Sequence, residues 1–128
     1  MRVLLDTHVL IWYFQTDPKM SSTALALLQT PSTIAFVSPA SHWELAIKLG
    51  TGKLSLNEPF DDFLQRAIFD NGFSILPIET THSSALLSLR HHHRDPFDRM
   101  LIAQGIVEGM PIISADAVFD LYPVQRLW

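Results

Sequence analysis

The sequence predicts an α/β domain in which helices cover both faces of a parallel sheet. Segments with strand character alternate with segments with helical character along the 128 residues. Several strand segments are short apolar runs, such as Val3-Leu4-Leu5 and Ile112-Ile113. Such runs are typical of parallel strands that are buried on both faces. In folds of this kind, ligands bind outside the carboxyl ends of the strands.

The first 38 residues predict two strands and two helices. Arg2–Asp6 is an apolar run that ends at a carboxylate, and we expect a buried strand there. His8–Gln15 predicts a short helix that ends before Asp17-Pro18, because the residue before proline disfavours helical backbone. Ser21–Gln29 is rich in alanine and leucine and predicts a second helix. Thr33–Ser38 is apolar and partly β-branched, which indicates a strand.

Two further helices are expected in the middle of the chain. Ser38 followed by Pro39 is a helix start, because serine is a favoured N-cap and proline suits the first helical position. That helix is expected to reach about Leu49 and to end at Gly50. Phe60–Asp70 predicts an amphipathic helix, with Phe60, Phe63, Leu64 and Ala67 on one face.

The C-terminal part continues the alternation. Phe73–Ile78 predicts a strand, and a helix is expected from Thr80 or Thr81 through about Arg90. Asp95-Pro96-Phe97-Asp98 opens a helix that should reach Glu108, before Gly109. Pro111–Ser114 predicts a strand, and Val124 is expected in a last edge strand.

Composition indicates one globular domain over residues 1–128. Hydrophobic residues make up 48% and charged residues 17% of the chain, which favours a packed core over disorder. Cysteine is absent, which excludes disulfides, thiolate metal sites and a cysteine nucleophile, and fits a cytoplasmic protein. No secretion signal is recognised, and no apolar stretch approaches the ~20 residues that span a bilayer. The net charge of −4 disfavours tight binding of nucleic acid by charge alone.

Four carboxylates are expected to meet at one edge of the sheet. Asp6 and Asp116 each follow a predicted strand, while Glu44 and Asp98 are expected in the first turns of neighbouring helices. Hard divalent cations such as Mg²⁺ prefer oxygen ligands, and carboxylates crowded without a cation would repel one another. A bound Mg²⁺ can activate water and stabilise charge that develops on a phosphodiester.

Each acid also has a purely structural interpretation. Asp95 is placed to cap the helix that follows, and Asp98 would then only complement the helix dipole. Glu44 would be a polar residue on a helix whose core side chains are Trp43, Ala46, Ile47 and Leu49. The functional interpretation depends on the four acids converging.

Four ordered motifs resemble those of the PIN-domain nucleases. They are Leu4-Leu5-Asp6-Thr7-His8, Ser41–Lys48 around Glu44, Asp95–Gln104 around Asp98, and Gly109–Asp116. Each motif is weak alone, but the ordered set covers nearly the whole chain. The subfamily that the chain resembles most is the VapC-like toxins of type II toxin–antitoxin pairs, in which Asp-Pro-Phe-Asp-Arg is common.

The resemblance implies a three-layer α/β/α sandwich and an endoribonuclease that depends on Mg²⁺, with Mn²⁺ as an alternative. Asp6, Glu44, Asp98 and Asp116 would be the catalytic and metal-binding acids. Thr7 would support Asp6, or its water, through its hydroxyl. Metal-activated water would cut RNA and leave a 5′-phosphate. A cognate antitoxin, an RNA substrate and a homodimer are the implied partners, with no membrane partner.

One position departs from the family pattern. Gly105 stands where the family usually has alanine or another small residue. Because glycine costs about 1 kcal/mol in a helix interior, we expect a loosened helix without an effect on the site.

Other residues leave two interpretations open. Arg94, Arg99 and Lys48 could contact RNA phosphates or be solvated helix residues. His91, His92 and His93 could bind metal or RNA, although a surface loop is the simpler interpretation. The aromatic run Trp12–Phe14 could belong to the core, or form an apolar patch that accepts an antitoxin or a second subunit.

Three other functions could use acids on a sheet of this kind. A phosphatase of the haloacid dehalogenase type requires a second Asp at position 8, where the chain has His8. A response-regulator receiver requires a phosphoacceptor Asp and a later Lys, and neither follows the predicted strand at 73–78. A non-catalytic PIN-like interaction module remains open on fold grounds, although the four acids argue against it.

Overall fold

The computed structural model describes all residues from Met1 to Trp128 and has the predicted α/β architecture. Five strands form one sheet in the order β3-β2-β1-β4-β5, and every neighbouring pair is parallel. The strands are β1 (Arg2–Leu5), β2 (Ile34–Val37), β3 (Ser74–Ile75), β4 (Ile112–Ile113) and β5 (Arg126–Leu127). All five carboxyl ends therefore lie at one edge.

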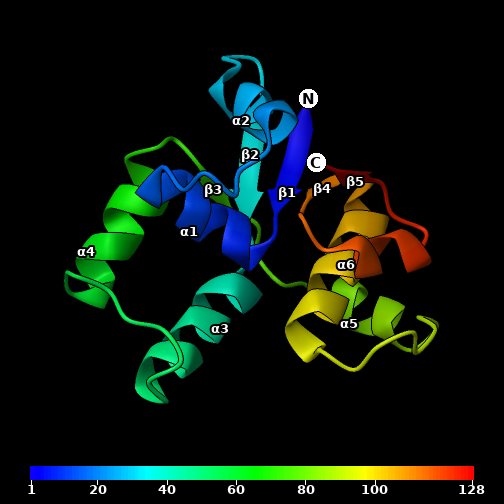
Figure 1. Cartoon of the computed structure of the whole chain (residues 1–128). Coiled ribbons are helices and arrows are strands. Elements are labelled where there is room, and N and C mark those ends of the chain that lie inside the picture. Colours follow the sequence, from blue (N-terminus) through cyan, green and yellow to red (C-terminus); the bar gives the residue numbers. More distant parts are fainter.

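Helices cover both faces of this sheet, so the domain has three layers (Figure 1). They are α1 (Thr7–Gln15), α2 (Ser22–Gln29), α3 (Pro39–Gly50), α4 (Phe60–Leu64), α5 (Thr80–Leu86) and α6 (Pro96–Glu108). A π-helical turn, η1 (Gln65–Phe69), continues α4, and a 3₁₀ helix, η2 (Ala117–Leu121), precedes β5. No helix combines the length and the apolar character needed to span a membrane.

The two faces of the sheet have separate hydrophobic cores. Val3 and Leu5 of β1 pack with residues of α1, α2, α3 and η1 on one face. Leu4 points to the opposite face and packs with residues of α6 and η2. This alternation follows from the two-residue period of a strand, and it explains why β1 is apolar at each of these positions.

Local signals placed several boundaries correctly. Ser38 caps α3 through its hydroxyl, Asp95 caps α6 through its carboxylate, and both helices have proline at their first position. Gly109 ends α6 with a φ of 62°, in the left-handed region that glycine adopts at little cost. The C-cap of α3 is Thr51, one residue after the predicted end at Gly50.

The structure corrects the predicted extent of β3. The strand expected at 73–78 is reduced to Ser74–Ile75 at the edge of the sheet. Only one further backbone bond, from Leu76 N–H to Val37 O, extends the pairing. Pro77 follows and has no N–H to donate, which ends the ladder.

Tertiary contacts also shorten α5 and shift the last strand. The helix ends at Leu86 instead of near Arg90, because Leu89 is buried in the second core and its carbonyl accepts from Arg99. Val124 lies outside the last strand, which is Arg126–Leu127. Its side chain instead packs against the second core.

The buried face of α3 is not the one suggested by the structural interpretation of Glu44. Trp43 and Ile47 are 61% and 43% exposed and Ala46 is exposed as well, so that interpretation was wrong for these three residues. Glu44 and Leu45 are buried, and α3 packs against α6 and α1. The acid therefore faces the interior of the domain while the tryptophan faces solvent.

Candidate active site

Asp6 is the most deeply placed of the four predicted acids. It follows β1, caps α1 and is 5% exposed. Its Oδ1 accepts from the Thr7 backbone N–H at 2.7 Å, and its Oδ2 accepts from the Ser114 hydroxyl at 2.7 Å. Burial raises the pKa of Asp6, and the hydrogen bond from Ser114 opposes that increase.

The hydroxyl of Thr7 does not bond directly to Asp6, which was one of the two roles predicted for it. It donates to the Ser41 hydroxyl at 3.0 Å, while the contact of Thr7 with Asp6 is made by its backbone N–H. The pair therefore joins the start of α1 to the start of α3.

Ser114 is a site residue that the sequence reasoning missed. It follows β4, is fully buried, donates to Asp6 and accepts the Asp116 backbone N–H at 3.0 Å. It thereby connects the first predicted acid with the last, 110 residues apart. The available signal was a small hydroxyl residue at a strand end, two positions before an acid.

Glu44 lies in α3 and is 6% exposed. It stands in the second helical turn, since Pro39 begins the helix, and not in the first turn as predicted. Its Oε2 is 2.9 Å from Lys48 Nζ, one turn further along the helix. This ion pair supplies one positive charge beside an otherwise acidic site.

Asp98 lies in the first turn of α6, with a side chain that is 16% exposed. Burial, followed by repulsion from Asp6, Asp95, Glu44 and Asp116, raises its pKa from 3.8 to about 8. The charges of all the predicted acids thus act on this one carboxyl. The four predicted acids therefore lie near enough to one another, at the carboxyl edge of the sheet, for the charges of the other three to act on Asp98.

Asp116 and Asp95 are both helix caps. Asp116 is exposed, and its Oδ1 accepts from the Val118 N–H at 3.0 Å at the start of η2. Asp95 Oδ1 accepts from the backbone N–H groups of Phe97 and Asp98 at 2.9 and 3.0 Å. The cap predicted for Asp95 is therefore confirmed.

The donor set fits a hard divalent cation in chemistry. It consists of carboxylate oxygens, and burial disfavours the ionised forms of Asp6 and Asp98, a cost that a cation would offset. No three His, Asp or Glu side chains lie close enough together, as they stand, to bind one ion.

The loop between α5 and α6 contributes a histidine to the site. His93 Nε2 lies 3.1 Å from Asp98 Oδ2, and the His93 ring also contacts the Tyr122 hydroxyl. Of the three consecutive histidines, His91 and His92 are exposed, as the surface-loop interpretation requires. The sequence contained no signal that singled out His93.

The predicted phosphate contacts occupy different environments. Lys48 lines a cavity of ≈ 240 Å³ beside Glu44 and Asp95, together with Lys53, which was not among the predicted contacts. Arg94 is exposed and lines a second cavity of ≈ 580 Å³ with His91. Arg99 is 7% exposed and donates to the carbonyls of Leu89 and Arg90.

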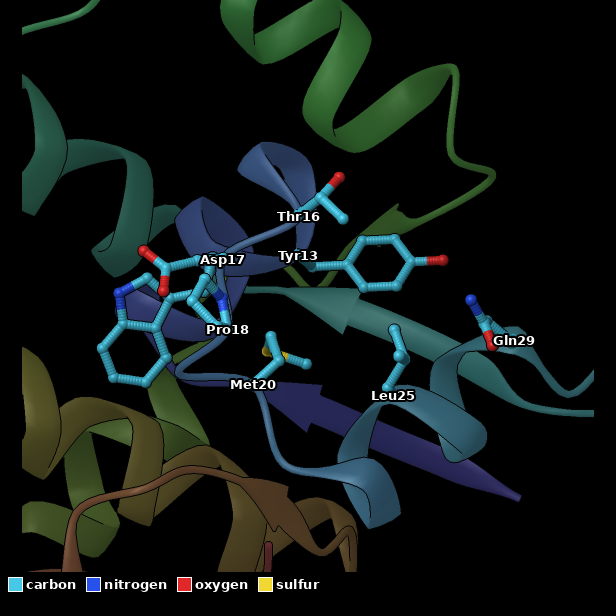
Figure 2. A pocket seen from close by; sticks show the side chains of 8 residues that line it. Tyr13, Thr16, Asp17, Pro18, Met20, Leu25 and Gln29 are labelled. Atoms are coloured by element: carbon cyan, nitrogen blue, oxygen red, sulfur yellow. The ribbon is translucent and has the colours of Figure 1, made fainter.

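The aromatic run after Asp6 is half-buried against the first core and also borders a surface pocket. Trp12 and Tyr13 line this pocket of ≈ 440 Å³ with Met20 and Leu25. Figure 2 shows Tyr13 of α1 facing Met20 and Leu25 across it, with polar side chains at its margin. The core interpretation of the run is therefore partly correct, and the interface interpretation stays a prediction.

Comparisons with known proteins agree with this architecture. The family model described as PIN domain matches residues 3–124. A structure of VapBC2 from Rickettsia felis, bound to a DNA fragment from its promoter, is similar with a TM-score of 0.75 at 17% identity, covering 99% of this chain and 98% of that chain. No curated protein matches the chain.

Two FitAB-type structures are also similar in fold. One is FitAB bound to an IR36 DNA fragment, with a TM-score of 0.64 at 20% identity, covering 98% of this chain and 93% of that chain. The other is FitAcB from Neisseria gonorrhoeae, with a TM-score of 0.66 at 18% identity, covering 98% and 96%.

Proposed function

The chain belongs to the PIN domain family, and from that premise we propose that it is a divalent-metal-dependent endoribonuclease acting as the toxin of a toxin–antitoxin pair. The observation that carries the proposal is the convergence of Asp6, Asp95, Glu44 and Asp116 around the half-buried carboxyl of Asp98, whose pKa burial and their repulsion raise. An acidic cluster of this kind is costly without a cation. A bound divalent cation would offset the repulsion between these carboxylates.

We assign the metal to Asp6, Asp98, Glu44 and Asp116, with Mg²⁺ as the ion and Mn²⁺ as a substitute. Asp6 and Asp98 are the central ligands, since both are held by hydrogen bonds from neighbouring segments. Bound Mg²⁺ would lower the pKa of water and offset charge on the phosphodiester. Ser114 orients Asp6, and the Thr7 N–H fixes the other oxygen of the same carboxylate.

An exposed aromatic beside the acids favours a nucleic acid over a small phosphate ester. Trp43 is 61% exposed and stands directly before Glu44 in α3. Its ring packs edge-on against Phe97, the neighbour of Asp98, with 5.2 Å between ring centroids. Exposed aromatic rings stack on unpaired bases. A phosphatase has no need of such a platform, so this observation disfavours that alternative.

Basic residues near the site would contact flanking phosphates. Lys48 and Lys53 line the cavity next to Glu44, and Arg94 lies on the loop before α6. Arg99 is the least suited of the predicted phosphate contacts, because its guanidinium already donates hydrogen bonds to two backbone carbonyls of the chain.

The antitoxin is proposed as a small protein that covers the pocket between α1 and α2. The similar solved structures are those of VapBC2 and FitAB, each bound to a DNA fragment. In this chain, Trp12, Tyr13, Met20 and Leu25 offer an apolar surface with a polar margin, as a protein interface requires. The resemblance also implies a homodimer, which light scattering on the purified chain would test.

The function is tested by incubating purified, antitoxin-free protein with total cellular RNA and Mg²⁺ and mapping the cut ends. EDTA and the Asp98→Asn variant should each abolish cutting, whereas Asp62→Asn, the same change at an exposed position on α4, should not. Single-stranded DNA of the cut sequence and p-nitrophenyl phosphate are run in parallel. Intact RNA with a folded protein would favour a non-catalytic module, and turnover of p-nitrophenyl phosphate alone would favour a phosphatase.

A further inference from the structure

The loop between α5 and α6 is built so that one of its histidines meets Asp98. The buried guanidinium of Arg99 donates to Arg90 O at 2.7 Å and to Leu89 O at 3.1 Å, which holds the loop against α6. His93 then lies with its ring 19% exposed and its Nε2 3.1 Å from Asp98 Oδ2. These contacts fix the positions of Arg99, His93 and Asp98 relative to one another.

Hydrogen bonds around Tyr122 determine which ring nitrogen of His93 carries the proton. The Tyr122 oxygen accepts the His93 backbone N–H at 3.2 Å and Arg99 Nη1–H at 3.3 Å. A phenolic hydroxyl has one proton to give, and with its lone pairs engaged it donates that proton to His93 Nδ1 at 2.7 Å. A neutral imidazole that accepts at Nδ1 is protonated at Nε2. His93 therefore donates to Asp98.

This donation distinguishes the two oxygens of Asp98. Oδ2 accepts from His93, while no hydrogen bond within the chain engages Oδ1. Groups that hold a metal-binding side chain from behind orient it, and their loss typically costs 10–100-fold in metal affinity. We propose that His93 is a positioning residue that holds Asp98 Oδ2 and leaves Oδ1 for the divalent cation. The inference rests on the proposed function.

The test compares Mn²⁺ affinity among variants by isothermal titration calorimetry, with metal-free unfolding temperatures as a check of folding. His93→Leu removes the donor and should raise the Kd for Mn²⁺ by about 10–100-fold. His93→Gln returns an N–H near the position of Nε2 and should restore the affinity to within about 3-fold. His91→Leu makes the same change at an exposed position of the same loop and should leave the affinity unchanged.

A purely structural role would lower the unfolding temperature and leave the Mn²⁺ affinity of the folded variant unchanged. That result for His93→Leu would overturn the inference while Asp98→Asn still lost binding, so the proposed function would survive. Should His93→Leu fail to fold, Tyr122→Phe removes only the hydroxyl that orients His93, and it decides by the same criterion. A wild-type protein that binds no Mn²⁺, or an Asp98→Asn variant that binds it equally well, would overturn both proposals.

Discussion

Replacing Asp98 with asparagine should make the metal-free protein more stable at alkaline pH. The pKa of Asp98 is about 8 in the folded chain against an ordinary value of 3.8. Between these values the folded chain retains a proton that the unfolded chain has released. The contribution of this group to stability is therefore complete below pH 3.8 and is lost as the pH rises through 8. Asparagine has no proton to lose and retains an oxygen that can accept from His93.

The expected size follows from the shift. A difference of about 4 pH units corresponds at most to about 6 kcal/mol, at 1.36 kcal/mol per unit. The side chain is 16% exposed, and water screens the repulsion between partly exposed charges. We therefore expect less than half of the maximum, about 2–3 kcal/mol at pH 9 relative to pH 4. For a chain of this length, that difference moves the unfolding temperature by about 10 °C.

The assay is thermal unfolding of the wild type and of Asp98→Asn in EDTA from pH 4 to pH 9. The difference between the two curves reports the titration of Asp98 together with its interaction with Asp6, which is present in both proteins. At pH 8, Mg²⁺ at 100 times its Kd should stabilise the wild type by about 2.7 kcal/mol and leave the variant unchanged. Superimposable pH profiles for the two proteins in EDTA would refute the electrostatic reasoning.

Three further predictions concern the surroundings of the site. Asp95→Ala should lower the free energy of unfolding, measured by urea denaturation, by about 1 kcal/mol through loss of the α6 cap, while Asp95→Asn should change it little. Equal losses in the two variants would mean that the charge of Asp95 matters and not its role as a cap. Gly105→Ala should lower the free energy of unfolding by about 1 kcal/mol, because a Cβ would lie 3.0 Å from Val124 Cγ2 and 3.1 Å from Met110 O. Overpacking costs about 1–3 kcal/mol, which exceeds the gain in helix propensity of ~1 kcal/mol, and a higher unfolding temperature would contradict this. Trp43→Ala should weaken binding of a single-stranded RNA in EDTA by about 1–3 kcal/mol, measured by fluorescence anisotropy, without a loss of stability; unchanged affinity would remove Trp43 from the substrate surface.

Gly105 shows where a local rule stops being sufficient. Helix propensity predicted a loosened α6, since glycine is a weak helix former. In the structure, this position faces Val124 and Ile112 at close range, so a side chain there would meet atoms of β4 and of the segment before β5. Propensity describes the isolated helix, whereas the cost of a methyl group depends on what packs against it.

The sequence alone determined the alternation of strands and helices, the caps at Ser38, Asp95 and Gly109, and the four acids at one sheet edge. Those features depend on residues next to one another, or on the rule that parallel strands end together. Tertiary structure decided that His93 meets Asp98, that Ser114 donates to Asp6 from 108 positions away, and that Trp43 faces solvent. These contacts depend on how helices pack and rotate against the sheet, and no spacing along the chain encodes that geometry.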